Sequence, residues 1–406
     1  MKRNILAGFL CLGLILSLFS GCAGTEMPAP APTTAPVVQE LPGTEPTEAP
    51  ALMETEPVED LGPLTRISAG VLRGKIDAAE FYALGENLLV ASKGETYDAS
   101  SQSFAFDSRL TLVSPKDGTV LATYSYDLPE RSVLKTVGET AMMVDTYWGS
   151  IDVVLDSSLT PLETYIPTAE VLPIEIDCEK GYCDGYWLSA DLQRLYVLYS
   201  PEPDAAYDLF CVDLKTSTVT PMVADMQLAS AAYEDDQYVV LNYYTAEGPR
   251  VCSLDLHTGE LDWAPMNVWP RARQGSTWLM QDDNDTYTFY VCTPEGVKTY
   301  PLGEIIDEQT RLQYNVATNI FLPSEQHLFL RGGDYGRSGT LYDVSGNFIS
   351  HYEFPEFLND PSCTVSVPVW SESDGGYYLL ANSGDSCDLY FWDISVPTEG
   401  DPLRAE

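Results

Sequence analysis

The chain has 406 residues, of which 61 are acidic and 21 basic, so its formal net charge at pH 7 is −40. A surface of this sign repels phosphate backbones and anionic lipid faces, which argues against nucleic acid as a partner. Because the nine cysteines contain no Cys-x-x-Cys pair and only three histidines are present, we predict no metal site and no cofactor.

Residues 1–21 have the pattern of a bacterial signal peptide. Lys2 and Arg3 precede an apolar run from Ile5 to Phe19, which is shorter than the roughly 20 residues that a membrane-spanning helix needs. The run ends in Ser20-Gly21-Cys22, which resembles the bacterial lipoprotein box, where small residues precede a lipidated cysteine. The resemblance implies lipidation of Cys22 and an extracytoplasmic protein that touches the cell membrane through its lipid anchor alone. The alternative is an ordinary signal peptide followed by a chance cysteine.

Residues 22–62 are rich in Pro, Thr and Glu and contain no basic residue. Their apolar content is too low to form a core, so we predict a disordered linker that follows the lipidated cysteine. In the polyproline II conformation, at ~3.1 Å per residue, such a linker reaches on the order of 100 Å. The folded part is predicted over residues 63–398, and residues 399–406 are predicted to be a C-terminal tail.

Residues 63–398 alternate apolar and polar side chains with a period of two, which is typical of strands. A tight polar turn followed by an apolar strand recurs seven times, and each copy is followed by an apolar strand that ends in a second turn. The copies begin at Gly85, Gly138, Asp191, Asp235, Gln274, Ser324 and Asp374. This spacing predicts an all-β chain that forms a single WD40-like β-propeller of seven four-stranded blades. Six and eight blades are alternatives, because residues 164–184 are irregular.

The two ends of this region predict how the ring closes. The last repeat ends at Ser395, which leaves no room for a fourth strand in the final blade. Arg66 to Leu72 form a spare strand before the first repeat. We expect this N-terminal strand to complete the final blade, because a closed ring leaves no exposed sheet edge.

One repeat, from Ser253 to Trp263, resembles the tryptophan-docking repeat of quinoprotein-like propellers, Ala-x-Asp-x-x-Thr-Gly-x-x-x-Trp, with Ser253 in place of Ala. The resemblance implies that Asp255 and the Thr258-Gly259 pair shape a turn between outer strands, and that Trp263 packs between blades. It covers one blade well and two weakly, and it implies no quinone site.

The loops that follow the inner apolar strands are expected to surround one mouth of the central channel, where propellers commonly bind ligands. Aromatic rings beside carboxylates suit stacking on sugars and contacts with cationic groups. The candidate ligand-binding residues are Tyr147, Trp148, Tyr207, Tyr243, Tyr244, Trp269, Arg271, Asp283, Asp285, Tyr335 and Arg337. Arg273 is expected on the same face. The alternative is that these side chains serve in turns and blade packing.

The run from Asp282 to Asp285 lacks the glycine and the distal glutamate of a calcium-binding loop, so we predict a hairpin loop there. Cys178 and Cys183 are the candidates for a small-loop disulfide. The other mature cysteines stand in apolar strand contexts, where cysteine packs as a small apolar residue.

These features favour a cell-envelope lipoprotein whose propeller binds or scaffolds a glycan, peptide or protein without catalysis. The sequence contains no Gly-x-Ser-x-Gly nucleophile elbow and no phosphate-binding glycine motif. The alternative is a carbohydrate-active propeller enzyme that uses paired carboxylates from the same loops.

Overall fold

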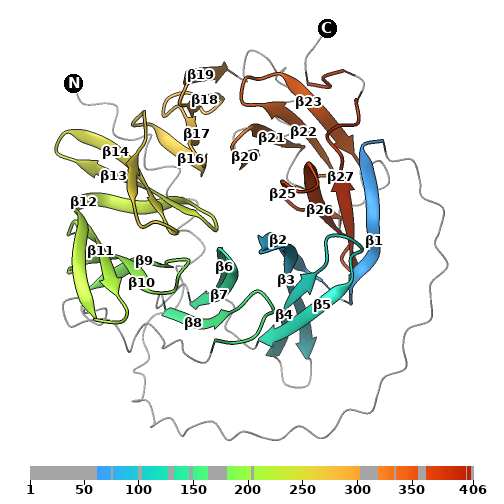
Figure 1. Cartoon of the computed structure of the whole chain (residues 1–406), viewed down its shortest axis with the longest axis horizontal. Helices are drawn as coiled ribbons and strands as arrows, with labels where there is room; N and C mark the ends of the chain where they lie inside the picture. The colour runs from blue at the N-terminus through green and yellow to red at the C-terminus, as the bar shows by residue number, and fades with distance from the viewer. Residues whose placement is uncertain are drawn as a thin grey trace, which may run out of the picture. The chain divides into compact units, whose positions relative to one another are not determined.

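A computed structural model describes residues 62–74, 76–98, 103–126, 132–145, 150–162, 181–202, 205–301, 319–332, 335–354, 363–398 and 400–403. These residues form 27 strands in six antiparallel sheets. The sheets succeed one another in chain order around a common axis, so this region is a single all-β propeller (Figure 1). None of these residues forms a helix long and apolar enough to span a membrane.

The first three sheets take up the N-terminal half of the propeller. The first contains β2 (Ala78–Leu84), β3 (Asn87–Asp98), β4 (Ser103–Val113) and β5 (Val120–Tyr126). The second contains β6 (Ser132–Val137), β7 (Thr140–Asp145) and β8 (Ser150–Leu155). The third contains β9 (Tyr182–Leu188), β10 (Arg194–Ser200), β11 (Tyr207–Asp213), β12 (Thr218–Glu234), β13 (Tyr238–Thr245), β14 (Gly248–Asp255) and β15 (Leu261–Trp263).

The remaining three sheets complete the ring. The fourth contains β16 (Trp269–Gln274), β17 (Thr277–Gln281), β18 (Thr288–Thr293) and β19 (Gly296–Pro301). The fifth contains β20 (Ile320–Ser324), β21 (His327–Gly332), β22 (Ser338–Asp343) and β23 (Phe348–Glu353). The sixth contains β1 (Leu64–Arg73), β24 (Thr364–Val365), β25 (Val369–Ser371), β26 (Gly376–Asn382) and β27 (Ser386–Trp392).

All seven predicted repeat turns join two consecutive strands, beginning with the β2–β3 turn and ending with the β25–β26 turn. The strand after each turn is apolar because sheets pack against both of its faces. In β26, Tyr377 and Leu379 pack with residues of the fifth sheet, whereas Tyr378 and Leu380 pack with residues of the first sheet. Alternate residues of one strand therefore belong to two different cores, which explains why the period-two pattern becomes a continuous apolar run there.

The predicted ring closure is confirmed. Strand β1 pairs antiparallel with β27, with Leu64 opposite Trp392 and Arg73 opposite Ser386 (Figure 1). Gly70 lies in an irregular part of β1 with a φ of 62°, and its N–H donates to the Asp388 side chain at 2.7 Å. The first described strand thus covers an edge of the last sheet and joins the two ends of the propeller.

The seven predicted four-stranded blades do not appear as seven separate sheets. The six sheets contain five, seven, four, four, four and three strands, and the seven-stranded one consists of two ladders that share β12. The first part of β12 pairs with β11 and its second part with β13. Asp225 and Leu228 have φ values of 57° and 50° and lie where β12 changes from one ladder to the other. The two ladders are therefore joined by a bent strand and not by a loop.

The chain divides into two compact units, residues 1–55 and residues 56–406, and every described residue belongs to the second. The predicted signal peptide, Cys22 and nearly all of the predicted linker lie outside the described residues. Within the predicted C-terminal tail, Leu403 is buried against the core that contains β16 and β20 residues.

Candidate functional site

The ends of the strands define two faces of the ring. We call the face that carries the seven repeat turns the turn face, and the face at the opposite strand ends the loop face. On the loop face lie the start of β9, the bend of β12, and the loops β10–β11, β13–β14 and β17–β18. The turn face is rich in polar contacts within the ring, whereas the loop face carries exposed aromatic side chains.

The turn face is held together by contacts between neighbouring sheets and between the two ladders of the third sheet. The backbone N–H of Ser276, in the β16–β17 turn, donates to Glu325 in the β20–β21 turn at 2.8 Å. Near the same face, the Trp187 indole of β9 donates to Glu234 of β12 at 3.0 Å, and Lys135 of β6 pairs with the same carboxylate. These polar groups link neighbouring parts of the ring, so they serve the architecture.

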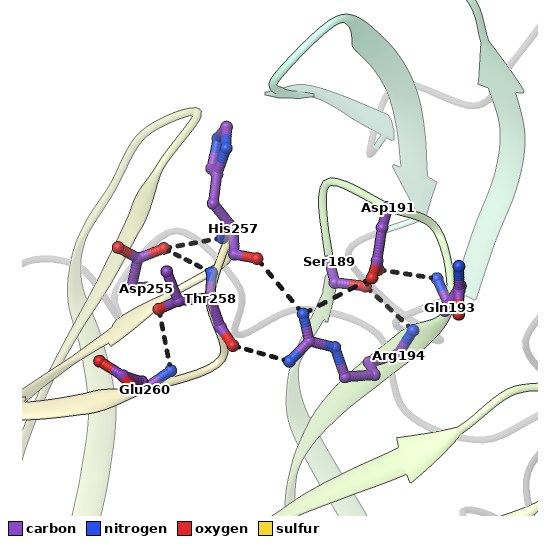
Figure 2. A network of polar contacts seen from close by, with 8 residues as sticks. All are labelled: Ser189, Asp191, Gln193, Arg194, Asp255, His257, Thr258 and Glu260. Atoms are coloured by element: carbon purple, nitrogen blue, oxygen red, sulfur yellow. Dashed lines mark hydrogen bonds and ion pairs between the residues drawn. The ribbon is translucent and has the colours of Figure 1, made fainter.

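Figure 2 shows one such link, between the β9–β10 turn and the repeat that resembles the tryptophan-docking motif. The Arg194 guanidinium donates to the backbone oxygens of Thr258 at 2.8 Å and of His257 at 3.3 Å. The Asp255 side chain accepts from the N–H groups of His257 and Thr258 at 2.8 and 3.0 Å, and Gly259 takes a φ of 79°. Asp255 and the Thr258-Gly259 pair therefore shape the turn, as the resemblance implied.

Trp263 does not pack between blades. It ends β15, the short outer edge strand, and 53% of its surface is exposed. The tryptophan of the motif is therefore present in sequence without the docking contact that the resemblance implied. The physical reason is its position on an edge strand of three residues, where no further strand covers it.

Arg273 was expected on the loop face, but the structure places it beside the repeat turn at the other end of β16. Its guanidinium lies between the rings of Tyr238 and Trp278, with Cζ 4.5 and 4.7 Å from the two ring centroids. It also pairs with Asp262 at 2.9 Å and donates from Nε to the Gly275 oxygen at 3.0 Å. These residues line a cavity of about 490 Å³ on the turn face. Arg273 connects Tyr238 and Asp262 of the third sheet with Trp278 of the fourth.

Asp235 caps the β12–β13 turn. Its carboxylate accepts from the Gln237 N–H at 2.9 Å, from the Tyr233 hydroxyl at 2.8 Å and from the Gln274 amide at 2.7 Å. Burial raises the pKa of Asp235 to about 6, because desolvation of the charged form outweighs these donors. This carboxyl group therefore titrates well above an ordinary aspartate.

We expect Asp235→Asn to remove one component of the pH dependence of stability. The pKa of about 6 in the folded state exceeds the ordinary value of 3.8, so the folded state binds the proton more tightly. The contribution of Asp235 to stability is then largest below pH 3.8 and declines as the pH rises to about 6. Urea unfolding at intervals from pH 4 to 7 should show the wild-type free energy of unfolding decreasing relative to that of the variant. Parallel curves would contradict the prediction. Asp213→Asn is the control, because hydrogen bonds from Thr216 lower the pKa of Asp213 and move its effect below this window.

The loop face carries most of the predicted ligand-binding residues that the structure describes. Tyr244, Trp269 and Tyr335 are exposed by 50%, 44% and 47% respectively. Asp283 and Asp285 are also exposed. The partly buried candidates are Tyr207, Arg271 and Arg337. Tyr147 and Trp148 lie outside the described residues.

Tyr243 is a correction to the predicted set. Only 3% of its surface is exposed, and it packs in the core formed by the β9–β15 strands. Successive side chains of a strand point to opposite faces of the sheet. The Tyr243 side chain therefore points into the core, while that of Tyr244 points outward. Tyr243 is therefore a packing residue.

The acidic loop between β17 and β18 is a hairpin loop, as predicted. The Asp282 side chain accepts from the N–H groups of Asn284 and Asp285 at 2.8 and 3.0 Å, and from the Tyr290 hydroxyl at 2.7 Å. The Tyr290 hydrogen bond is the main reason why the pKa of Asp282 is lowered. Asp283 accepts from the N–H of Trp269 at 3.2 Å, and burial raises its pKa. In the part of the chain that the structure describes, no three His, Cys, Asp or Glu side chains are grouped to hold a metal ion.

Arg337 and Tyr335 form a pair at the edge of the loop face. The guanidinium Cζ lies 4.5 Å from the Tyr335 ring centroid, and Nε donates to the Cys363 oxygen at 3.0 Å. One face of the Tyr335 ring is therefore engaged within the protein, while nearly half of its surface stays exposed.

Two exposed residues on the loop face were missed by sequence reasoning. Leu228, at the bend of β12, is 79% exposed, and Tyr182, at the start of β9, is 49% exposed. Tyr182 is an aromatic residue that directly follows the irregular segment, so its residue type and position could have suggested it from the sequence. Leu228 gave none, because its exposure comes from a left-handed backbone conformation in the middle of a strand.

Cys183 is disulfide-bonded, and its partner lies outside the described residues. The pairing with Cys178 therefore stays a prediction. Among the described residues, the cysteines that form no disulfide are Cys211, Cys252, Cys292, Cys363 and Cys387, and all except Cys211 are buried. Burial raises the pKa of Cys252 to about 12, so this thiol stays protonated and packs as a small apolar side chain.

Comparison with known proteins adds structural likenesses alone. No protein-family model matches the chain, and no curated protein matches it in sequence. Among solved structures, it is similar to BamB from Moraxella catarrhalis, with 11% identity, a TM-score of 0.39, and coverage of 81% of this chain and 97% of the other. It is also similar to the β-propeller domain of the Trilobed protease from Pyrococcus furiosus, with 10% identity, a TM-score of 0.46, and coverage of 79% and 94%.

A third likeness is with oligogalacturonate lyase from Vibrio parahaemolyticus, with 12% identity, a TM-score of 0.41, and coverage of 81% of this chain and 92% of the other. At these identities such likenesses concern the fold and carry nothing about activity. The strand pairing of this chain is what defines it as a propeller.

Proposed function

We propose that this protein is a lipid-anchored component of the bacterial cell envelope whose propeller binds or scaffolds a partner on its loop face without catalysis. One observation carries the proposal. Five large apolar side chains are exposed at this face, namely those of Tyr182, Leu228, Tyr244, Trp269 and Tyr335. Exposed aromatic residues gathered on one face mark interaction surfaces more often than single scattered residues do.

The contrast between the faces supports this assignment. Polar side chains of the turn face, such as Arg194 and Glu325, are occupied by contacts between neighbouring ladders or sheets. The other exposed large apolar residues of the described chain lie on the outer strands β5, β15 and β19 or after β27. Four of the five exposed aromatic side chains among the described residues, all except Trp263, thus lie on the loop face.

We propose a ring of seven blades. The seven repeat turns support this number, provided that the ladders β9–β12 and β12–β15 count as two blades joined through one strand. A continuous strand then takes the place of the loop that usually joins the outer strand of one blade to the inner strand of the next.

The alternative function, a carbohydrate-active enzyme, draws on Asp282 and Asp283, whose pKa values move in opposite directions. However, the Asp282 oxygens are occupied by donors of its own hairpin loop. Release of reducing ends from anionic or neutral polysaccharides by the wild type, abolished in Asp283→Asn, would favour the enzyme. Unchanged polysaccharides would favour binding.

Lipid anchoring has a direct test. We expect the Cys22→Ser variant to lose incorporation of labelled palmitate and to leave the membrane fraction, because burial of acyl chains contributes about 0.8 kcal/mol per CH₂ to membrane attachment. Cys11→Ser is the matched control and should incorporate label like the wild type. Label in the Cys22→Ser protein would contradict anchoring at this residue.

Partner binding is tested by crosslinking in intact envelopes. Replacing Tyr182, Tyr244, Trp269 and Tyr335 by serine should abolish the crosslinked products that the wild type forms. The control replaces Val120, Leu121 and Val297 by serine, since these side chains are equally exposed but lie on outer strands. Retention of the products by the loop-face variant, or their loss in the control, would reject the loop face as the binding surface.

A further inference from the structure

We infer that the loop face over β9 to β18 recognises a cationic polypeptide segment, rich in Lys or Arg, of a partner protein. This inference rests on the proposed binding function and names the chemistry of the partner. It comes from three features of the same surface, which are its uncompensated negative charge, its exposed aromatic rings, and the strained bend of β12.

The charge of this surface is strongly one-sided. The described loop-face segments of β9 to β18 carry two arginines, Arg250 and Arg271, and no lysine. Against these two they carry eight carboxylates, which are Asp184, Glu202, Asp208, Asp225, Glu247, Asp282, Asp283 and Asp285. Such a surface attracts a cationic partner and speeds its association.

The arginines do little to neutralise the carboxylates. Arg250 pairs with Glu247 at 2.6 Å, so this pair cancels internally. Arg271 is partly buried and stays charged, so the two arginines together leave six of the eight negative charges uncompensated. Asp208 accepts a hydrogen bond from the Asp225 N–H at 2.9 Å, and Asp283 accepts one from the Trp269 N–H at 3.2 Å. These donors are neutral, so they orient the carboxylates and leave the negative charge in place.

The exposed aromatic rings lie among these carboxylates. The exposed Trp269 is joined to Asp283 by the hydrogen bond from its own backbone, and the partly buried Tyr207 hydrogen-bonds to Asp184. Trp and Tyr rings attract guanidinium and ammonium groups through their faces, and the apolar stems of Lys and Arg pack on the same rings. A ring beside a carboxylate therefore matches both parts of a cationic side chain.

The bend of β12 supplies an apolar anchor within this surface. Leu228 has a φ of 50° and is 79% exposed, and the neighbouring Gln227 pairs with Tyr244 in β13. A left-handed conformation is unfavourable for leucine, and strained backbone of this kind is concentrated at binding and switch sites. A neutral glycan would use the rings but would gain nothing from the charge, which is why a polypeptide fits better.

The test uses the full chain carrying Cys22→Ser, with fluorescence anisotropy of labelled peptides. We expect a Lys/Phe peptide to bind, and its Glu/Phe counterpart and neutral oligosaccharides not to bind. Affinity should fall by about 10-fold or more as salt rises from low ionic strength to physiological values, because the attraction is screened. Leu228→Ser should weaken binding while leaving the salt dependence unchanged.

Two variants with equal net charge separate a specific surface from general attraction to an acidic protein. Glu202→Gln, Asp225→Asn, Asp283→Asn and Asp285→Asn together should weaken binding by about 10-fold or more. Asp117→Asn, Asp156→Asn, Asp213→Asn and Asp393→Asn together, all in turns of the turn face, should leave it unchanged. Equal losses in both would overturn the inference.

The outcomes also separate this inference from the proposed function. A cationic partner is rejected if the Lys/Phe peptide fails to bind. It is also rejected if a neutral oligosaccharide binds and the Lys/Phe peptide cannot displace it. The loop face would still stand as a binding surface if its serine variant lost the crosslinked products in envelopes. If that variant kept them, the proposed function itself would fall.

Discussion

Replacing Leu64 by aspartate is expected to lower the free energy of unfolding of the propeller by about 3–5 kcal/mol. Leu64 is 3% exposed, stands opposite Trp392 in the β1–β27 ladder, and packs in the core between the fifth and sixth sheets. The substitution removes buried apolar surface and places an unpaired carboxylate there. It also loosens the strand that covers the edge of the last sheet, so the ring would open at its closure.

The neighbouring Thr65 provides the control. Thr65 belongs to the same strand and pairs with Phe391, but its side chain is exposed. Thr65→Asp should change the free energy of unfolding by no more than about 0.5 kcal/mol. Urea unfolding followed by tryptophan fluorescence measures both variants. Equal stability of Leu64→Asp and Thr65→Asp would show that β1 is dispensable for the fold.

The second large effect is expected at Arg273. Arg273→Ala should lower the free energy of unfolding by about 2–4 kcal/mol, because it removes two cation–π contacts, the ion pair to Asp262 and the hydrogen bond to Gly275. Only 8% of Arg273 is exposed, so its ring contacts are largely shielded from water. The loss also leaves a cavity between the Tyr238 and Trp278 rings.

The exposed ion pair between Arg250 and Glu247 is the comparison. Its atoms lie 2.6 Å apart, yet the side chains are 39% and 79% exposed. Arg250→Ala should change the free energy of unfolding by less than about 1 kcal/mol. Thermal and urea unfolding of the two alanine variants test the ranking. If Arg250→Ala lowered the free energy of unfolding as much as Arg273→Ala, the contacts of Arg273 with the Tyr238 and Trp278 rings would not be the source of the stability.

Much of the fold follows from local patterns. A tight turn needs residues such as Gly85 or Asp235, and a strand packed on both faces needs a continuous apolar run. Both signals occupy a few adjacent residues and recur along the chain, so they predicted the hairpins correctly. The closure by β1 was predictable too, because the last repeat lacks a strand and the chain has a spare one upstream of the first repeat.

The separation of blades was less predictable. The segment around Asp225 and Leu228 contains no glycine or proline at the bend, and nothing local announces that two non-glycine residues take positive φ values. Strand β12 therefore passes through the boundary between two ladders without a loop. Pairing with β11 before the bend and with β13 after it accompanies this conformation.

The candidate site shows the same division. Residue types and loop positions led to Tyr244 and Trp269, which the structure shows to be exposed, while their role in ligand binding stays a prediction. They also led to Tyr243, which is buried, and placed Arg273 on the wrong face. In a strand, a shift of one residue reverses the direction of a side chain, so composition cannot separate Tyr243 from Tyr244.

By itself, the sequence determined that this is an acidic, strand-rich chain, built from repeating hairpins and completed by its own N-terminal strand. These properties depend on charge, on period-two alternation and on turn residues, all of which act over a few neighbouring positions. Only the tertiary structure decided that β12 joins two ladders, that Arg273 lies between two rings, and that Leu228 projects from the loop face. Each of these depends on how ladders and sheets pack together, since burial and side-chain direction are set by the neighbours that the fold brings into contact.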